Sequence, residues 1–257
     1  MQWRRYTIRN DCGGDPRQFD QEYPSEPDDA FLLSGEGIFD NKFIKQLRDG
    51  ISIIGSHYEI DFVKNKIIPA HAGELIIYRQ PEQGKRYVLA ADTAKGKEDG
   101  DYDAAYVLEE RTGEMCAALH GKWDTNLYGK NLNTLGEYYN TALLAVENNN
   151  TGESVLNTLF NTCHYPLLFM YKKSFGWNTN QATRPVMISD FKEAIRDQLY
   201  DIYCPELYSE CHDDRILAYS IVLQVRKVAG RWFDWYAKKQ QQRAESRDDY
   251  NEEVGWI

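Results

Sequence analysis

The chain has 257 residues, enough to bury the core of one large domain or of one domain with an appendage. Apolar residues make up 42% of it and charged residues 27%, ordinary values for a globular protein. No apolar run approaches the roughly 20 residues of a membrane-spanning helix, and residues 1–6 lack the apolar core of a secretion signal. We therefore expect an intracellular protein.

The net charge of −10 argues at first against a nucleic-acid partner, which prefers a basic surface. The charge is unevenly distributed, however. Residues 226–243 carry six basic side chains against one acid, whereas the last fourteen residues carry five acids and one arginine. A domain whose acids surround metal ions can be acidic overall and still bind a phosphate backbone locally, so composition leaves the partner open.

The first part of the chain shows little periodicity. Prolines and a glycine pair interrupt residues 1–60, which we interpret as a linker and N-terminal extension with a short helix at 40–50. Residues 51–80 are typical of β-structure or extended chain. We expect a main domain over 61–228 and a C-terminal helical tail over 229–257.

The clearest pattern lies in residues 86–109. Tyr87–Ala91 is an apolar run typical of a strand buried on both faces, and it ends at Asp92. A Gly-, Lys- and Asp-rich connection containing Asp101 leads through Asp103 into a second apolar run, 104–108. A carboxylate at the end of a buried strand is costly unless it is paired, hydrogen-bonded or bound to a cation. The alternative is that Asp92 caps the strand and the other acids are solvated turn residues.

The next elements predict a mixed α/β fold. A third strand is expected at 115–119, an amphipathic helix at 127–140, and a buried strand at 142–147 that ends at Glu147. Three hairpin-linked strands, a crossover helix and a strand parallel to the first describe a mixed sheet. With a further strand at 167–171, the prediction is a five-stranded sheet flanked by helices.

Later helices have recognisable starts. Thr151 is a plausible N-cap, residues 190–193 form a capping box for a helix to about residue 201, and Asp213-Asp214 opens an apolar helix to about residue 228. Between them, residues 172–185 form a polar loop, in which Trp177 is expected to be an anchor. The basic residues Lys172, Lys173 and Arg184 flank this loop.

Acids therefore bound three buried elements: Asp92, Glu147 and the Asp213-Asp214 pair. Ends of neighbouring parallel strands lie side by side, and a helix N-terminus directed at the same edge would complete a carboxylate cluster. Such hard oxygen ligands suit two Mg²⁺ or Mn²⁺ ions, which can activate water against a phosphodiester without a protein nucleophile. Each acid alone could instead be a cap or a turn residue.

Five motifs in order resemble the nuclease domain of the large terminase subunit of tailed bacteriophages, over residues 18–228. They are Glu22-Tyr23-Pro24-Ser25-x-Pro27-x-x-Ala30-Phe31, Ala91-Asp92-Thr93-Ala94-x-Gly96 with Asp101-Tyr102-Asp103-Ala104, Ala145-Val146-Glu147-Asn148-Asn149-x-Thr151-Gly152, Gly176-Trp177-x-Thr179-Asn180-x-x-Thr183-Arg184-Pro185, and His212-Asp213-Asp214-Arg215-x-x-Ala218.

The resemblance implies an RNase H-like fold and a metal-dependent endonuclease that cuts concatemeric double-stranded viral DNA during packaging. It implies Asp92, Glu147, Asp213 and Asp214 as metal acids, with Asp101 as an accessory acid. Catalysis would rest on Asp92, Glu147 and Asp214. With DNA as the substrate, we expect Lys172, Lys173 and Arg184 to bind its phosphates without reading sequence. The implied partners are viral DNA, the terminase ATPase domain, the small terminase subunit and the portal protein, in the host bacterial cytoplasm.

The chain departs from that family in one respect. It has no Gly-x-x-x-x-Gly-Lys-Ser/Thr phosphate loop, so we expect a nuclease domain without the ATPase motor. Two alternatives stay open at this stage. One is another RNase H-like nuclease, of the junction-resolvase or transposase type. The other is a DNA-docking module that does not cleave.

Overall fold

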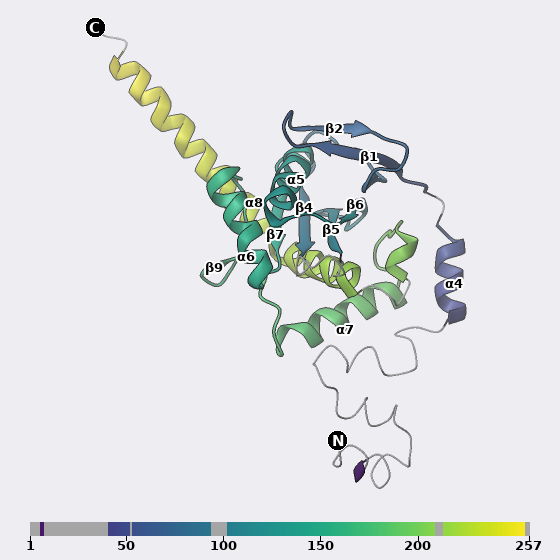
Figure 1. Ribbon diagram of the computed structural model, residues 1–257. Coiled ribbons are helices and arrows are strands. Elements are labelled where there is room, and N and C mark those ends of the chain that lie inside the picture. Colours follow the sequence, from purple (N-terminus) through teal and green to yellow (C-terminus); the bar gives the residue numbers. More distant parts are fainter. Residues whose placement is uncertain (1–5, 8–40, 52, 94–101, 209–212, 255–257) are drawn as a thin grey trace. The chain divides into compact units, whose positions relative to one another are not determined.

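The computed structural model describes residues 6–7, 41–51, 53–93, 102–208 and 213–254 (Figure 1). Within these ranges, the side chains of 41–44, 213 and 243–254 are left out of the description. The chain divides into two compact units, Met1–Gly50 and Ile51–Ile257. The described part of the first unit includes one helix of nine residues, α4 (Asn41–Asp49), close to the helix expected at 40–50. The predicted domain boundaries after residues 60 and 228 stay predictions.

A mixed sheet of seven strands forms the centre of the second unit, in the order β2-β1-β3-β6-β5-β4-β7. All neighbours pair antiparallel except β4 and β7, which are parallel. The strands are β1 (Ser56–Asp61), β2 (Lys66–Pro69), β3 (Leu75–Ile77), β4 (Tyr87–Asp92), β5 (Asp103–Glu109), β6 (Met115–Gly121) and β7 (Leu143–Val146).

Helices pack on this sheet. The long α8 contacts β4, β5 and β7, and α7 packs on α8, while α5 contacts β1, β2 and α6 (Figure 1). The described helices include none that is long and apolar enough to cross a membrane. The helical segments are α5 (Thr125–Tyr138), α6 (Asn150–Asn157), the π-helical turn η1 (Thr158–Thr162), α7 (Thr183–Arg196), the 3₁₀ turn η2 (Pro205–Tyr208) and α8 (Asp213–Val254).

The predicted mixed α/β fold is confirmed. Every residue of β4 and β5 is buried, which explains why their apolar runs show no alternation. The hairpins β4-β5-β6, the crossover helix α5 and the parallel strand β7 occur in the expected order.

The predicted strand count was too low. The sheet has seven strands rather than five, because residues 56–77 add β1, β2 and β3 beside β6. The segment expected as a fifth strand, 167–171, instead forms an isolated bridge between Leu168 and Leu144. Its end then pairs as β8 (Met170–Tyr171) with β9 (Ser174–Phe175) in a separate hairpin.

The capping box proposed at residues 190–193 is also wrong. Helix α7 begins seven residues earlier, at Thr183, so Asp190 lies inside it. The Asp190 carboxylate accepts hydrogen bonds from the side chains of Gln224 and Lys227 on α8. This acid therefore joins two helices rather than starting one.

Candidate active site

Asp92 and Glu147 lie beside each other at one edge of the sheet. In the parallel pair β4 and β7, Ala91 is opposite Val146, so each acid occupies the next position of its own segment. The Glu147 backbone N–H donates to the Ala91 carbonyl oxygen at 2.9 Å, which fixes the register at this point. Asp92 is only 5% exposed and Glu147 only 8% exposed. The predicted convergence of these two acids is thus visible in the backbone.

The electrostatics of the pair reflect this arrangement. Burial raises the pKa of Asp92 well above its usual value, and the charge and hydrogen bonding of Glu147 raise it further, as does the charge of Asp214. A hydrogen bond from the Thr93 backbone N–H to Asp92 Oδ1, 2.9 Å long, acts in the opposite direction. The three carboxylates therefore share one electrostatic environment, in which a cation would relieve their mutual repulsion.

Asp214 reaches this environment from the start of α8. Its Oδ2 accepts the backbone N–H of Tyr102 at 3.1 Å, which connects α8 to the chain entering β5. The N-terminal end of a helix carries a partial positive charge and favours a carboxylate there. Asp213 begins the same helix, but its side chain lies outside the described set, as does Asp101, which falls within 94–101. Their predicted roles stay predictions.

Asn149 holds Glu147 in place, although it was not predicted to be a site residue. Its Nδ2 donates to Glu147 Oε2 at 2.6 Å, while its Oδ1 accepts the Thr93 hydroxyl at 3.0 Å. The same Oδ1 accepts the backbone N–H groups of Thr151 and Gly152, so Asn149 caps α6. The proposed N-cap, Thr151, was wrong. The run Asn148-Asn149-Asn150 was the available signal, since asparagine is a preferred N-cap.

Asp103 is a further buried acid at this edge. It is 4% exposed and precedes Ala104, the residue that pairs with Asp92 across β4 and β5. Its Oδ2 accepts the backbone N–H of Trp123 at 3.2 Å. Asp103 was predicted to lie at the entry to a strand but not to be a metal acid.

Tyr128 of α5 supports the ends of both central strands. Its hydroxyl donates to the Ala104 carbonyl oxygen at 2.9 Å and lies 3.3 Å from the Asp92 carbonyl oxygen. Burial raises the pKa of Tyr128, and the charges of Asp103, Asp92 and Asp214 add to the effect. This hydroxyl therefore stays protonated and keeps its structural role.

The loop after β9 is attached beside Glu147. The Trp177 backbone N–H donates to the Val146 carbonyl at 2.8 Å, and its own carbonyl accepts the Asn148 N–H at 2.6 Å. The indole is buried, with Nε1 3.1 Å from Met187 Sδ. Trp177 is therefore an anchor, as expected. Gly176 precedes it at φ +83°, and a Cβ there would lie 2.4 Å from the Val146 oxygen.

The predicted DNA contacts fall on two elements. Lys172 and Lys173 are exposed in the turn between β8 and β9, whereas Arg184 is partly buried in the first turn of α7. The two lysines are neighbours in sequence, and Arg184 lies on a separate element. Their predicted role in binding stays a prediction.

The donor set fits a hard divalent cation in its chemistry, because carboxylate oxygens are the ligands that Mg²⁺ and Mn²⁺ prefer. Within the described part of the chain, no three His, Cys, Asp or Glu side chains are already arranged to hold a metal ion. Two of the five predicted metal acids, Asp101 and Asp213, have side chains outside that part.

Comparison with known proteins gives matches only among solved structures, since no family model and no curated protein matches the sequence. The large terminase nuclease from thermophilic phage G20c with bound magnesium is 13% identical at a TM-score of 0.50, covering 68% of this chain and 95% of that one. Another structure of the G20c large terminase nuclease is 14% identical at a TM-score of 0.48, covering 69% of this chain and 97% of that one. The Thermus phage P74-26 large terminase nuclease domain is 13% identical at 0.47, covering 61% and 87%.

At these identities the likeness concerns the fold. The backbone resembles that of a large terminase nuclease structure, and the predicted RNase H-like fold is confirmed.

Proposed function

We propose that this chain is the metal-dependent endonuclease domain of a viral DNA-packaging terminase, which cuts concatemeric double-stranded DNA by hydrolysing phosphodiester bonds. The observation that carries the proposal is the pair of buried carboxylates, Asp92 and Glu147, at adjacent ends of parallel strands. Asp214 adds a third negative charge to the same environment. The shared fold supports it, because the G20c terminase nuclease has been crystallised with magnesium.

Asp92, Glu147 and Asp214 would hold two Mg²⁺ or Mn²⁺ ions, with Asp101 and Asp213 as further ligands. When bound, such ions supply a nucleophilic water and stabilise the charge on the leaving oxygen. Asn149 orients Glu147 through its 2.6 Å hydrogen bond. The Thr93 N–H does the same for Asp92. These two groups fix the directions of the carboxylates before a cation arrives.

The attacking group would be water, because the hydroxyls beside the acids are committed elsewhere. The Thr93 hydroxyl donates to Asn149 Oδ1, and the Tyr128 hydroxyl donates to a strand carbonyl. Burial also raises the pKa of Tyr128, which disfavours a tyrosinate nucleophile.

The protein partners would be the terminase ATPase domain, the small terminase subunit and the portal protein. DNA would contact the basic side chains of Lys172, Lys173 and Arg184. Phosphate contacts of this kind position a duplex without reading its sequence. A terminase nuclease should therefore cut plain linear duplex DNA. A junction resolvase would need a branched substrate, and a transposase would need specific terminal sequences.

The direct test is a cleavage assay on plasmid and on linear duplex, with Mg²⁺, Mn²⁺ or EDTA. Both Asp92→Ala and Glu147→Ala should abolish cutting, while circular dichroism and thermal unfolding confirm that each variant folds. Glu153→Ala is the matched control, because Glu153 is an exposed acid on α6 just after the site. Robust cleavage in EDTA, or full activity in both site variants, would refute the proposal. Cleavage restricted to branched DNA would favour a resolvase.

A further inference from the structure

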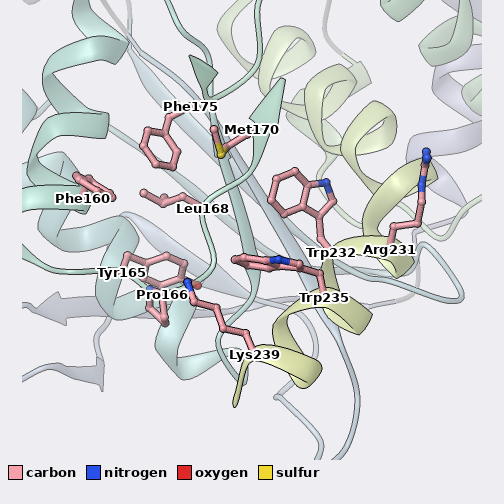
Figure 2. Close-up of a pocket in the computed structure, with 10 residues that line it drawn as sticks. All are labelled: Phe160, Tyr165, Pro166, Leu168, Met170, Phe175, Arg231, Trp232, Trp235 and Lys239. Atoms are coloured by element: carbon pink, nitrogen blue, oxygen red, sulfur yellow. The ribbon is translucent and has the colours of Figure 1, made fainter. Parts of the chain in front are cut away.

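An apolar groove lies between α8, η1 and the β8–β9 hairpin (Figure 2). Its volume is about 540 Å³, within the range of sites that bind a ligand or a peptide anchor. The side chains that matter here are Phe160, Leu168, Met170, Phe175, Trp232 and Trp235. None of them belongs to the acid cluster, so this aromatic groove is a second site.

The aromatic groove is formed before any partner arrives. Trp232 packs against Phe169 with ring centroids 5.5 Å apart and meets Trp235 edge-on at 6.1 Å. On the opposite side, Phe160 and Phe175 lie 5.0 Å apart. Nevertheless Phe160 is 50% exposed and Trp235 is 48% exposed. Large apolar side chains left open in a shaped pocket are typical of an interaction site.

Charge defines the kind of partner. The charged residues that line the aromatic groove are both cations, Arg231 and Lys239. Lys239 Nζ lies 4.8 Å from the centre of the Trp235 ring, so the positive charge is directly beside the apolar surface. Asp234, which lies between Arg231 and Lys239 on α8, instead pairs with Arg86: its Oδ1 is 3.4 Å from Arg86 Nη1. The occupant should therefore combine bulky apolar anchors with acidic residues.

The chain itself contains a segment of that composition. We propose that the aromatic groove binds residues 244–257 of a second copy of this chain. The segment has five acids and one arginine, and its apolar side chains include Val254, Trp256 and Ile257. The apolar residues would fill the groove while the acids face Arg231 and Lys239.

The geometry of α8 makes this contact intermolecular. From Trp235 the helix continues without interruption to Val254, a rise of about 28 Å. A segment carried away along the helix cannot return to the groove beside Trp235 unless the helix breaks. Each copy would thus present its groove to one neighbour and its acidic segment to another. A head-to-tail contact of this type forms rings or open chains.

Duplex DNA is the other candidate for a basic, aromatic surface, and the lining argues against it. Phosphates could contact Arg231 and Lys239, but the stacked bases of a duplex cannot enter a pocket floored by Leu168 and Met170. The indole of a tryptophan or an aliphatic side chain can enter this pocket. The proposal is independent of nuclease activity, so its failure and that of the proposed function are distinguishable.

The test is analytical ultracentrifugation of the full chain over increasing concentration. The wild type should associate, and Trp256→Ala and Trp235→Ala should each weaken association at least tenfold. The two variants are complementary, because Trp256→Ala keeps its groove and Trp235→Ala keeps its acidic segment. An equimolar mixture should therefore recover association as a 1:1 dimer and grow no further. Val186→Ala, at a 54% exposed apolar residue of α7, is the matched control and should behave as wild type.

Charge reversal gives an independent readout. Arg231→Glu with Lys239→Glu should abolish association, and a partner carrying Glu252→Lys with Glu253→Lys should restore it. A wild type that stays monomeric at every concentration would overturn the proposal. So would association that neither tryptophan substitution changes, or a mixture of the complementary variants that fails to pair. A monomer whose affinity for duplex DNA falls in Trp235→Ala would assign the groove to DNA instead.

Discussion

Gly152 lies directly against the backbone of Glu147: a Cβ at Gly152 would be 1.8 Å from the Glu147 carbonyl oxygen. It would also be 3.3 Å from Asn149 Oδ1, the atom that caps α6. The first turn of α6 can therefore pack under the end of β7 only if residue 152 has no side chain. We therefore expect the position of the Glu147 carboxylate to depend on this close approach.

Gly152→Ala should consequently displace Glu147 and its cap. We expect cleavage to fall more than tenfold, and stability to fall by about 1–3 kcal/mol, as for other overpacked sites. Gly230→Ala in α8 is the matched control, because its Cβ would come no closer than 3.7 Å to the nearest group. That variant should keep its activity and gain about 0.5–1 kcal/mol. Urea unfolding and a cleavage assay measure both effects. Unchanged cleavage in Gly152→Ala would show that the approach does not position Glu147.

The two aspartates at the start of α8 should contribute unequally. Successive helical residues point about 100° apart, so Asp213 and Asp214 cannot do the same work equally well. Asp214 already accepts the Tyr102 N–H and raises the pKa of Asp92. We expect Asp214→Asn to remove nearly all cleavage at little cost in stability. Asp213→Asn should keep measurable activity with a raised metal requirement. Titrating Mn²⁺ against cleavage for both variants tests this, and an inactive Asp213→Asn beside an active Asp214→Asn would reverse the roles.

Neutralising Lys172, Lys173 and Arg184 together should weaken DNA binding alike for unrelated sequences and flatten its salt dependence. Binding is measured on the Glu147→Ala background, so that the DNA stays intact. Lys66→Gln is the control, because Lys66 is exposed on β2, at the opposite end of the sheet from β7. If affinity does not change, the duplex binds elsewhere, and the basic stretch 226–243 is the next surface to test.

The contact between α7 and α8 should depend on pH through Asp190. Burial raises the pKa of Asp190, but hydrogen bonds from Lys227 and Gln224 outweigh it and leave the pKa below its usual value. A carboxyl group with a depressed pKa stabilises the fold above its unfolded pKa, near 4, and loses that contribution as the pH falls through the folded value.

Asp190→Asn should therefore reduce stability at pH 7 by under about 1 kcal/mol, since the pair is partly exposed. The difference from wild type should shrink below pH 4. Urea unfolding at pH 7 and pH 3.5 measures it, with Glu193→Gln, an exposed acid on the same helix, as control. A difference that persists unchanged at pH 3.5 would contradict this assignment.

The central strands and two site acids could be predicted because burial dominates their sequence. Tyr87–Asp92 and Leu143–Val146 are fully buried, so each reads as a short apolar run that ends at an acid. The strands at the β2 end of the sheet were less clear, because every residue of β1 and β2 is exposed or half-exposed and neither strand forms a buried apolar run. A pattern of burial predicts a strand only where burial is strong.

Long-range partners explain the remaining differences. Asp190 and Glu193 have capping-box spacing, but Asp190 bonds to residues of α8 more than thirty positions later, which no local pattern shows. Asn149 is one of three adjacent asparagines, each of which could cap a helix. Only the positions of Glu147 and Thr93 distinguish it from its neighbours.

The order of the site acids along the chain has a consequence for biosynthesis. Asp92 and Glu147 belong to strands that pair with each other, so a growing polypeptide can bring them together once α5 and β7 have left the ribosome. Asp214 begins α8, the helix that packs across β4, β5 and β7. The third carboxylate therefore arrives with the element that closes the core. A nascent chain that stops before α8 has both a bare sheet face and an incomplete acid cluster. If the proposed function is correct, the chain should therefore become able to cut DNA only when α8 has closed the core.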